Sequence, residues 1–511
     1  MKTALLLCPS WDQMYPAYGP ALLAGALRRR GVSSRFHDLN KLFFSSAQSA
    51  ARDHGREAAM EILAPGEMWR QETFVRTRFA ELHAAFIEDA VDRVLVDSPR
   101  IAGFSVNLFN AWASIFVARR LKRRAPDVLI VFGGPECFKE SRAAELLAAG
   151  ADAVVLGEAD EAFPALVEAV RDGRDLSSVA GVLVKGAWAR RAAAVEMDAL
   201  ADPDFDGYDL NAYPNRELTL ETSRGCVRKC VFCNDWRQWE TFRQKSPEVI
   251  ARQIEAMLFR YEDARGFFFA DSVVNASMTK LLRLSDALEA RGGTPWSGYA
   301  IVRPEMDFPT LTRLKASGCW NLFYGVESGS DRVLRLMRKG PTQALNARVL
   351  RDTRRAGLTN VTFLLVGFPG ETEADFRLTL DFLKRNADSI GCLTASLCDV
   401  DDMADRWDEF GVDAPAGQTL FWKSRDGENT FPVRVDRFRR LVHAAFEAGV
   451  EVHVLRRGDR DSFMYYTERL LGEYYRFLGD SRRASGHERS AAAMLGDWEK
   501  GLSLRHASGA A

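Results

Sequence analysis

The chain has 511 residues and an almost neutral composition, with 69 Lys and Arg residues against 70 Asp and Glu residues and a formal net charge of −1. Its length allows about three or four domains. A hydrophobic content of 47%, with 32 Phe and 11 Trp, excludes wholesale disorder. The near-neutral charge gives no signature of a nucleic acid partner or an anionic membrane, and no apolar run is long enough to predict a membrane span.

The cysteines indicate both a compartment and a site. Eight cysteines are too few for a disulfide scaffold in a chain of this length, and three of them fall within eight positions. This usage predicts a cytoplasmic protein in which the clustered cysteines have a chemical role. The apolar segment Thr3–Cys8 is too short for a secretory signal and is interpreted as a buried strand.

Residues 1–190 alternate short apolar segments with amphipathic ones. The predicted strands are Thr3–Cys8, Ser34–Leu39, Ile101–Val106, Val128–Gly134 and Ala153–Glu158. Strands that alternate with helices are typical of βαβ units on a parallel sheet, so this region is predicted to be a doubly wound, Rossmann-like α/β domain. Its ligand crevice is expected at the carboxyl ends of the strands. An insertion over 41–99 interrupts the pattern and is predicted to be helical.

An acidic, proline-punctuated linker is predicted over 191–215, followed by a second alternating series over 216–410. The predicted strands of that series are Leu218–Ser223, Phe267–Ser272, Trp296–Arg303, Asn321–Ser328, Val361–Phe368 and Leu393–Val400, and the predicted helices cover 247–260, 277–291, 309–317, 342–356 and 373–386. Six β/α repeats predict a partial, TIM-type (β/α)6 barrel with its active residues on the loops after the strands. Residues 411–511 are predicted to be mainly helical, with a polar, frayed end from 480.

A C-x3-C-x2-C spacing, formed by Cys226, Cys230 and Cys233, follows the first strand of the second series. Three thiolates on one short loop can bind three corners of a cubane iron–sulfur cluster, and this leaves the fourth iron open for reactivity. A zinc ion would need a fourth ligand, and the nearest histidines along the chain, His83 and His443, are remote. Zinc with a ligand folded in from a distance stays open as an alternative.

The stretch from Thr222 to Cys226, together with Cys230 and Phe232-Cys233, resembles the radical S-adenosylmethionine (AdoMet, SAM) superfamily. Three further stretches support the resemblance, each at the end of a predicted strand and in the expected order: Phe268–Ser272, Gly325–Ser330 and Gly367–Thr372. The resemblance implies a [4Fe–4S] cluster, AdoMet bound to its fourth iron, and a flavodoxin- or ferredoxin-type electron donor. The AdoMet contacts that it implies are Phe232, Asp271, Ser272, Arg303, Glu327, Ser328 and Gly367.

These candidate residues suit different parts of AdoMet. Glu327 and Ser328 can form hydrogen bonds with ribose hydroxyls. Gly367 can help to present backbone groups to an adenine edge, although this stretch on its own favours an ordinary strand-to-helix turn that ends in a helix cap. Asp271 and Arg303 are expected at the same barrel mouth, where they hold the AdoMet carboxylate or the substrate, or pair with each other.

The N-terminal domain resembles the cobalamin-binding branch of the same superfamily. Ser105-Val106-Asn107 precedes Gly133-Gly134 by 25 residues, with Asn in place of the family's Leu, and Gly157-Glu158 follows the fifth strand. The cobalamin (vitamin B12) contacts that the resemblance implies are Ser105, Asn107, Gly133, Gly134, Pro135, Gly157 and Glu158. Many cobalamin carriers have Asp-x-His after the first strand, where this chain has Asp12-Gln13-Met14. The resemblance therefore implies cobalamin without a His ligand, or a domain that has lost the cofactor.

Together, the two resemblances imply a cobalamin-dependent radical SAM enzyme. The function they favour is a methyltransferase that uses a 5′-deoxyadenosyl radical and methylcobalamin to methylate an unactivated carbon of a small molecule or natural-product intermediate. A radical cyclase, rearrangement or other methyl-free reaction is the alternative. A tRNA methylthiotransferase is disfavoured because that group carries a second cysteine trio and a basic β-barrel tail. A non-enzymatic corrinoid-binding protein would leave the cysteine loop and Glu327 without a role.

Overall fold

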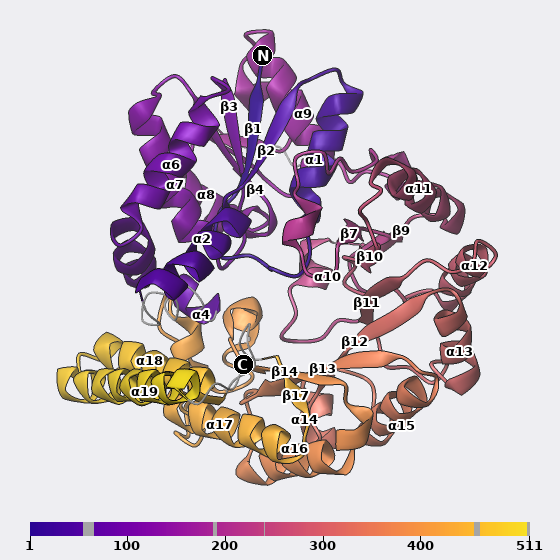
Figure 1. Ribbon diagram of the computed structural model, residues 1–511, viewed down its shortest axis with the longest axis vertical. Coiled ribbons are helices and arrows are strands. Elements are labelled where there is room, and N and C mark those ends of the chain that lie inside the picture. The colour runs from indigo at the N-terminus through magenta and orange to yellow at the C-terminus, as the bar shows by residue number, and fades with distance from the viewer. Residues whose placement is uncertain (55–65, 188–191, 240, 454–459, 508–511) are drawn as a thin grey trace. The chain divides into compact units, whose positions relative to one another are not determined.

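The computed structural model describes residues 1–54, 66–187, 192–239, 241–453 and 460–507 (Figure 1). The chain forms two compact units. The first comprises Met1–Thr222 and Arg243–Ala270, and the second comprises Ser223–Phe242 and Asp271–Ala511. Residues 55–65 of the predicted helical insertion lie outside the described residues.

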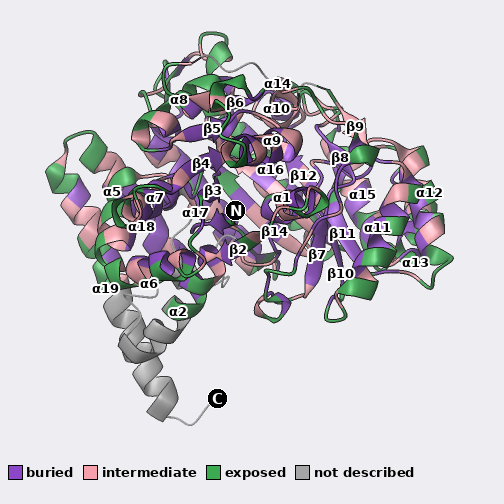
Figure 2. Ribbon diagram, turned by 90° about the horizontal axis from the view of Figure 1, so that it is seen from above, coloured by how far each residue is buried: buried purple, intermediate pink, exposed green. Residues whose placement is uncertain are grey.

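A six-stranded sheet forms the centre of the first unit, in the order β2-β1-β3-β4-β5-β6. Its strands are β1 (Thr3–Leu7), β2 (Ser34–Asp38), β3 (Ile101–Ser105), β4 (Leu129–Gly133), β5 (Ala153–Val155) and β6 (Val182–Val184). Strands β1 to β5 are parallel, and β6 pairs with β5 in the antiparallel sense. Every residue of β1 is buried, as expected for a parallel strand covered on both faces. Figure 2 shows buried residues in purple on strands such as β4 and exposed residues in green on helices such as α8 (Glu140–Ala149).

Helices cover both faces of this sheet, with α1 and α9 on one side and α6 and α7 on the other (Figure 1). The helices are α1 (Tyr18–Arg29), α2 (Leu39–His54), α4 (Gly66–Trp69), α5 (Glu72–Phe74), η1 (Val75–Glu81), α6 (Ala84–Leu95), α7 (Ala111–Arg124), α8 (Glu140–Ala149) and α9 (Ala159–Arg171). The predicted doubly wound domain is confirmed. Because the strand order reverses between β1 and β3, their carboxyl ends form the switch point at which such sheets bind ligands.

The first unit also contains the start of the second β/α series. Strands β7 (Glu217–Leu220) and β10 (Gly266–Phe269) pair in parallel, and α11 (Pro247–Arg260) lies between them in the chain. The unit's remaining short elements are η2 (Pro135–Cys137), η3 (Leu176–Ser178), η4 (Met197–Ala199), η5 (Leu210–Ala212) and β9 (Arg243–Gln244).

The second unit continues the series with parallel strands in the order β17-β14-β13-β12-β11. These strands are β11 (Trp296–Ala300), β12 (Cys319–Glu327), β13 (Thr359–Val366), β14 (Cys392–Leu397) and β17 (Glu451–Val452). The helices that alternate with them are α12 (Met278–Glu289), α13 (Phe308–Ala316), α14 (Asp331–Leu336), α15 (Gln343–Arg355) and α16 (Glu373–Arg385), with η6 (Ala387–Ser389) after the last. All six predicted strands are present, and the predicted α/β class is confirmed.

Side-chain caps explain where the helices of this series begin. In each of α11 to α16 the residue before the helix is Ser, Thr or Asp, and its side-chain oxygen accepts a hydrogen bond from a backbone N–H of the first turn. Such a cap satisfies one of the four N–H groups that the start of a helix leaves unpaired. These capping residues therefore help to define where each helix begins, and thus where the loop before it ends.

The C-terminal region is mainly helical, as predicted, with α17 (Phe431–Glu447), α18 (Arg460–Phe477) and α19 (Ser481–Ala507). Before them lie η7 (Asp401–Arg406), β15 (Val412–Asp413), η8 (Thr419–Phe421) and β16 (Lys423–Ser424). The predicted frayed end from 480 is wrong for the first part of α19, which packs along α18, and residues 508–511 lie outside the described residues. The small residues Ala484 and Ala491, two helical turns apart, are buried in that contact.

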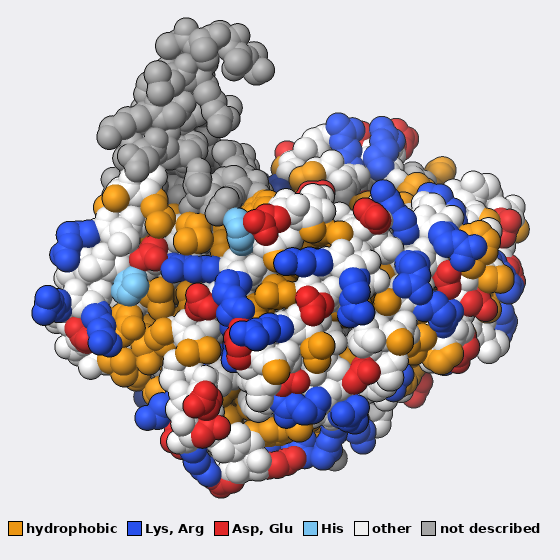
Figure 3. Space-filling model, turned by 90° about the horizontal axis from the view of Figure 1, so that it is seen from below, with side chains coloured by type: hydrophobic (Ala, Val, Ile, Leu, Met, Phe, Trp, Pro, Cys, Tyr) orange, Lys and Arg blue, Asp and Glu red, His pale blue; other side chains and the backbone are white. Residues whose placement is uncertain are grey.

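The surface carries both signs of charge. On the face drawn in Figure 3, Lys and Arg side chains are interspersed with Asp and Glu. None of the helices in the described part of the chain combines the length and the apolar character that crossing a membrane requires.

Candidate functional site

The three predicted cluster ligands lie in the second unit, on the loop between β8 (Ser223–Arg224) and α10 (Asp235–Gln238). All three are free thiols; Cys230 is buried, whereas Cys226 and Cys233 are partly exposed. Burial raises the pKa of each thiol, and each thiol also feels the charge of its neighbours on the loop. Thiolates at this position therefore need stabilisation by hydrogen bonds, positive charge or a metal.

Two backbone N–H groups supply part of that stabilisation. The N–H of Arg228 donates to Cys226 Sγ at 3.4 Å, and the N–H of Asp235 lowers the pKa of Cys233 against the larger effect of burial. Hydrogen bonds of this kind to cysteine sulfur tune the reduction potential of iron–sulfur clusters. Trp236 Nε1 donates to the carbonyl oxygen of Cys230 at 3.0 Å, which fastens the end of the loop to its middle.

Packing anchors the loop between its second and third cysteines. Val231 is 1% exposed, lies in an apolar cluster that includes Phe368 and Trp422, and donates its N–H to the carbonyl oxygen of Met337 at 3.0 Å. The next residue, Phe232, meets Phe368 edge to face, with ring centroids 6.4 Å apart. The cysteine loop is therefore fixed against the loop that follows β13.

A buried ion pair lies beside the cysteines. Glu327 ends β12 at a β-bulge, with a left-handed φ of 66° and only 8% exposure. Its Oε1 lies 2.7 Å from Lys339 Nζ. Burial opposes the charge of Lys339, but Glu327 and the thiols of Cys230 and Cys233 offset that effect, so the pKa of Lys339 is raised. Strained backbone at a strand end, held by its surroundings, is typical of functional sites.

Sequence reasoning missed Lys339. The available signal was its position in a Lys-Gly-Pro turn, twelve residues after Glu327 and just after α14. Gly340 has a positive φ of 96°, and a Cβ there would come within 2.6 Å of the Arg228 guanidinium. The glycine therefore permits close approach of this turn to the cysteine loop.

Three of the predicted AdoMet residues are engaged in holding the site together. Asp271 accepts hydrogen bonds from the N–H and hydroxyl of Ser223, at 3.1 and 3.0 Å. The hydroxyl of Ser272 bonds the Asp235 carboxyl and thereby opposes the effect of burial, which raises the pKa of Asp235. Ser328 is fully buried, with its Oγ 3.2 Å from Thr379 Oγ1 on α16.

Arg303 and Asp271 each pair with another residue. Arg303 forms a two-pronged ion pair with Glu305, at 2.7 and 3.1 Å. It also donates to the carbonyl oxygen of Asn275 at 2.9 Å. These bonds hold Arg303 at the end of β11, beside the loop that leads into α12.

Gly367 begins the loop after β13, and a hydrogen bond from Gly367 to Glu371 closes a tight turn there. It has a φ of 80°, and its N–H donates to Glu371 Oε2 at 2.8 Å. Burial raises the pKa of Glu371 to about 7, against the opposing charge of Arg437. The turn is thus built around a buried carboxyl group that accepts a backbone N–H of the glycine.

In the first unit, Asn107 and Asn110 organise the switch point. Asn107 Oδ1 accepts the N–H of Phe109 at 2.7 Å, and Asn110 Nδ2 donates to the carbonyl oxygens of Ser105 and Cys8, at 2.9 and 3.3 Å. These bonds join the ends of β1 and β3. Asn107 is 5% exposed, and its Nδ2 lacks a hydrogen-bond partner in the described part of the chain. A buried amide donor without a partner suits a ligand acceptor at this edge.

Glycines shape the rest of this edge. Gly134 has a φ of 111°, and a Cβ there would lie 2.7 Å from the carbonyl oxygen of Val106, so only glycine lets the loops after β3 and β4 approach this closely. Pro135 follows and starts η2, and Gly133 is the last residue of β4. Gly157, after β5, has a φ of 81°, and a Cβ there would have no neighbouring atom within 4 Å.

Glu158 forms an ion pair with an arginine of the same unit. This arginine is Arg243, and both side chains are largely buried. Arg243 also donates to the carbonyl oxygen of Val195 at 2.6 Å. Glu158 therefore fixes the loop after β5 through Arg243.

The donor sets fit the groups that the motifs imply. In the described part of the chain, no three Cys, His, Asp or Glu side chains are grouped as ligands of one metal ion. A cubane cluster makes a different demand, because each thiolate binds a different iron. That demand is met by three free thiols on one loop. N–H groups directed at sulfur and the ammonium of Lys339 can stabilise the thiolates. The unpartnered Asn107 donor and the glycines around it fit a large, amide-bearing ligand.

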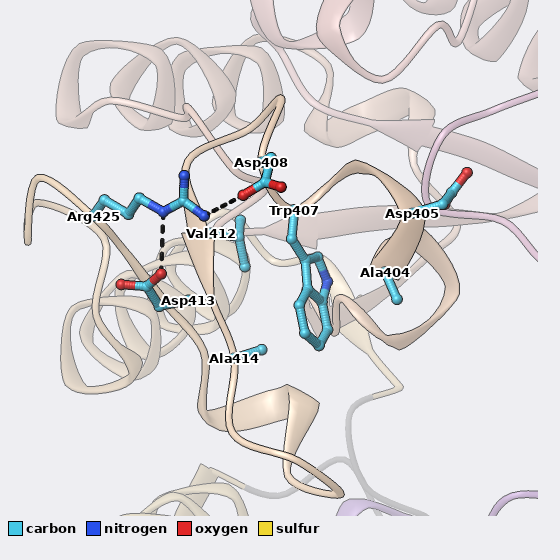
Figure 4. A pocket seen from close by; sticks show the side chains of 8 residues that line it. All are labelled: Ala404, Asp405, Trp407, Asp408, Val412, Asp413, Ala414 and Arg425. Carbon is cyan, nitrogen blue, oxygen red and sulfur yellow. Dashed lines mark hydrogen bonds and ion pairs between the residues drawn. The ribbon is translucent and has the colours of Figure 1, made fainter.

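A surface pocket lies in the segment that precedes α17 (Figure 4). Its lining residues are Ala404, Asp405, Trp407, Asp408, Val412, Asp413, Ala414 and Arg425. Arg425 bridges Asp408 and Asp413, and Asp405 pairs with Arg237 of α10 at 2.9 Å. The charged side chains of the pocket thus form ion pairs with one another or with Arg237 of α10. The pocket lining includes none of the site residues predicted from the sequence.

Two protein families match this chain. The radical SAM superfamily matches residues 220–383, and the B12 binding domain matches residues 10–167. An uncharacterized methyltransferase of Pyrococcus horikoshii is 25% identical over 297 residues, which cover 56% of this chain and 64% of that protein. The anaerobic magnesium-protoporphyrin IX monomethyl ester cyclase of Rubrivivax gelatinosus is 24% identical over 311 residues, covering 56% of this chain and 54% of the cyclase. The chain therefore matches between half and two thirds of the length of these relatives.

A solved structure supports the fold over nearly the whole chain. It is the radical S-adenosylmethionine methyltransferase TsrM from Kitasatospora setae, with cobalamin and a [4Fe-4S] cluster bound. The match has a TM-score of 0.60 at 16% identity and covers 96% of this chain and 99% of that one. A likeness at this identity concerns the fold, with a B12 binding domain followed by a radical SAM domain and a helical C-terminal region.

Proposed function

Because this chain belongs to the cobalamin-dependent radical SAM enzymes, we propose that it is a methyltransferase that acts on an unactivated carbon of a small molecule or natural-product intermediate. Its cofactors are a [4Fe–4S] cluster, AdoMet and cobalamin. When bound, they supply a 5′-deoxyadenosyl radical and a transferable methyl group. The observation that carries the proposal is that one chain presents two ligand-binding strand edges: the cysteine loop beside Lys339 and Glu327, and the glycine-shaped switch point with its unpartnered Asn107 donor.

We assign the cysteine loop and the Glu327–Lys339 pair to the cluster and AdoMet. Cys226, Cys230 and Cys233 bind three irons. The Glu327 carboxylate accepts hydrogen bonds from the AdoMet ribose, and Lys339 balances the negative charge of the thiolates and of the AdoMet carboxylate. Both side chains are already held in place by their 2.7 Å contact, so AdoMet binding costs little side-chain entropy.

The other predicted AdoMet residues act mainly by positioning. Asp271 fixes Ser223 at the entrance to the cysteine loop, and Ser272 fixes Asp235 at its exit. Ser328 fixes the end of β12 against α16. Phe232 places its ring 5.6 Å from Lys339 Nζ, and Gly367 shapes the loop that we assign to adenine. Arg303, tied to Glu305, borders the mouth at the end of β11.

We assign the switch point of the first unit to cobalamin. Asn107 Nδ2 would donate to the corrinoid, Ser105 would reach its nucleotide tail, and the backbone at Gly133, Gly134, Pro135 and Gly157 would border it. Glu158 positions the loop after β5 through Arg243. The loop after β1 contains no histidine, so this loop would supply no His ligand to cobalamin.

A methyl-free radical reaction is the second candidate. It is favoured by the similarity to a cyclase, at 24% identity over 56% of this chain. Both candidates need one electron for each radical formed, and we propose a flavodoxin- or ferredoxin-type donor.

Product analysis separates the two candidates even before the substrate is known. The reconstituted protein is incubated anaerobically with cobalamin, a chemical reductant and AdoMet that carries a deuterated methyl group. In a methyltransferase, one AdoMet gives up its methyl group and leaves S-adenosylhomocysteine. A second AdoMet accepts one electron and, with a hydrogen atom taken from a C–H group of the substrate, the buffer or the protein, yields methionine and 5′-deoxyadenosine. Formation of both adenosyl products supports the proposal, and 5′-deoxyadenosine alone supports the methyl-free alternative. Cys230→Ala is the matched control and should form neither.

A further inference from the structure

Helix α17, the first long helix of the C-terminal region, places Arg434 against the loop that follows β13. A Cβ on Gly367 would lie 2.3 Å from Arg434 Cδ and 2.4 Å from its Cγ. The aliphatic stem of Arg434 therefore occupies the space that a side chain at 367 would need. Gly367 also has a φ of 80°, which side-chain-bearing residues rarely adopt. Both this backbone conformation and the contact with Arg434 therefore require glycine at position 367.

Arg434 is itself held rigidly. It is 0% exposed, and its Nη2 donates to the carbonyl oxygens of Leu420 and Trp422, at 2.9 and 2.8 Å. The guanidinium lies over the Trp422 ring, 4.0 Å from its centroid. Burial lowers the pKa of Arg434 to about 9. The hydrogen bonds of this buried cation go to carbonyl groups rather than to a carboxylate, so it is fixed in place by the chain segments around it.

Two further residues of the same region hold the loop's backbone. Asn429 Nδ2 donates to the carbonyl oxygens of Gly367 and Phe368, at 3.3 and 3.4 Å. Arg437 Nη1 donates to the carbonyl oxygen of Glu371 at 3.2 Å and lies 3.4 Å from its carboxylate, which in turn accepts the N–H of Gly367. Both polar backbone groups of Gly367 are thus satisfied by groups that α17 and the turn before it supply or hold.

We propose that Arg434 is a positioning residue for AdoMet: it fixes the backbone at Gly367, so that the loop after β13 is pre-formed to receive the adenine. This inference rests on the proposed function, in which that loop binds AdoMet. It gives the C-terminal region a role in cofactor binding, although that region lies outside the part of the chain matched by the radical SAM superfamily. Pre-forming a binding loop raises affinity because less conformational entropy is lost on binding.

AdoMet affinity of the cluster- and cobalamin-loaded protein tests this role. Equilibrium dialysis with labelled AdoMet is compared for the wild type, Arg434→Met, Arg434→Lys and the control His443→Ala, which alters a partly exposed side chain on the same helix. We expect Arg434→Met to raise the Kd about tenfold or more, with unchanged iron and cobalt contents. Arg434→Lys keeps the stem, as Met does, and also a charged donor for the carbonyl groups of Leu420 and Trp422, so it should have a smaller effect than Arg434→Met. The KM for AdoMet in 5′-deoxyadenosine formation should rise more than kcat falls.

A double-mutant cycle gives a second test that does not depend on one variant folding well. Gly367→Ala should weaken AdoMet binding strongly in the wild-type background and less in the Arg434→Ala background, because the alanine Cβ then has room. Equal AdoMet affinity of the wild type and Arg434→Met, or strictly additive effects in the cycle, overturns the inference. A wild-type protein that carries its cluster but binds no AdoMet overturns the proposed function instead.

Discussion

The ammonium of Lys339 and the carboxylate of Glu327 form a buried ion pair, 2.7 Å apart, next to the cysteine loop. The two residues are brought together by the turn after α14, in which Arg338 has a left-handed φ of 54° and the N–H of Lys339 donates to the carbonyl oxygen of Leu334. Removing one partner of a buried pair leaves the other charge without compensation. We therefore expect substitution of either residue to change both AdoMet binding and the properties of the cluster.

Replacing Lys339 by Met should make the cluster harder to reduce. The ammonium stabilises the additional negative charge of a reduced cluster, and its loss should lower the reduction potential by tens of millivolts, on the order expected for one nearby charge. Potentiometric titration followed by electron paramagnetic resonance measures this shift. Lys339→Arg keeps the charge and should stay near the wild type. A potential that is the same in Lys339→Met and the wild type would contradict the assigned role.

Each of Cys226→Ala, Cys230→Ala and Cys233→Ala should abolish cluster binding and leave cobalamin binding intact, because the cobalamin site that we assign lies in the other unit. Iron, sulfide and cobalt are measured after anaerobic reconstitution. Cys392→Ser is the control, since Cys392 is a partly exposed free thiol on β14. Retention of a full cluster by any of the three alanine variants would rule out that cysteine as a ligand.

Gly134→Ala should reduce cobalamin binding about tenfold or more. The added Cβ meets the carbonyl oxygen of Val106 at 2.7 Å and pushes the loops after β3 and β4 apart. Gly186→Ala is a matched control, because Gly186 has a similar positive φ of 80° but no neighbouring atoms within 4 Å. Cobalt occupancy after reconstitution is the measurement. Equal losses in both variants would trace the effect to backbone strain rather than to the cobalamin site.

His37 on β2 should make the stability of the first unit depend on pH. Burial lowers the pKa of His37 to about 4, with the charge of Arg35 acting in the same direction. Between its ordinary pKa of 6.5 and about 4, the unfolded chain binds a proton that the folded chain does not, so stability falls as pH falls through this interval, by about 3 kcal/mol in all.

Urea unfolding at several pH values tests this expectation. His37→Leu removes the titrating group and should flatten the stability profile between pH 4 and 6.5; His443→Gln, at a partly exposed position on α17, is the control. Parallel profiles for His37→Leu and the wild type would show that other groups cause the pH dependence.

Local patterns in the sequence were sufficient to predict the strand series and the cysteine loop. Strand-length apolar runs and helix caps such as Ser246 and Thr372 mark the elements directly, and the three cysteines lie within one short motif. The predicted doubly wound domain and parallel second series followed from that alternation.

The residues that complete the site depend on long-range contacts and were not predictable in this way. Lys339 meets Glu327 because a bulge and a left-handed turn bring them together. Arg434 reaches Gly367 across 67 positions of chain, and nothing in its local sequence distinguishes it from the other arginines of α17. The packing of α19 on α18 was missed because Ala484 and Ala491 each bury little apolar surface, and only the contact between the two helices shows their role.

The most direct test of the account is to count both cofactors on the same protein. The chain is reconstituted anaerobically with iron, sulfide and hydroxocobalamin, freed of unbound cofactor, and analysed for iron, sulfide and cobalt. The account predicts about four iron, four sulfide and one cobalt per chain. A full cluster without cobalt would contradict it, because the first unit would then be a scaffold without its cofactor and methyl transfer through cobalamin would be impossible.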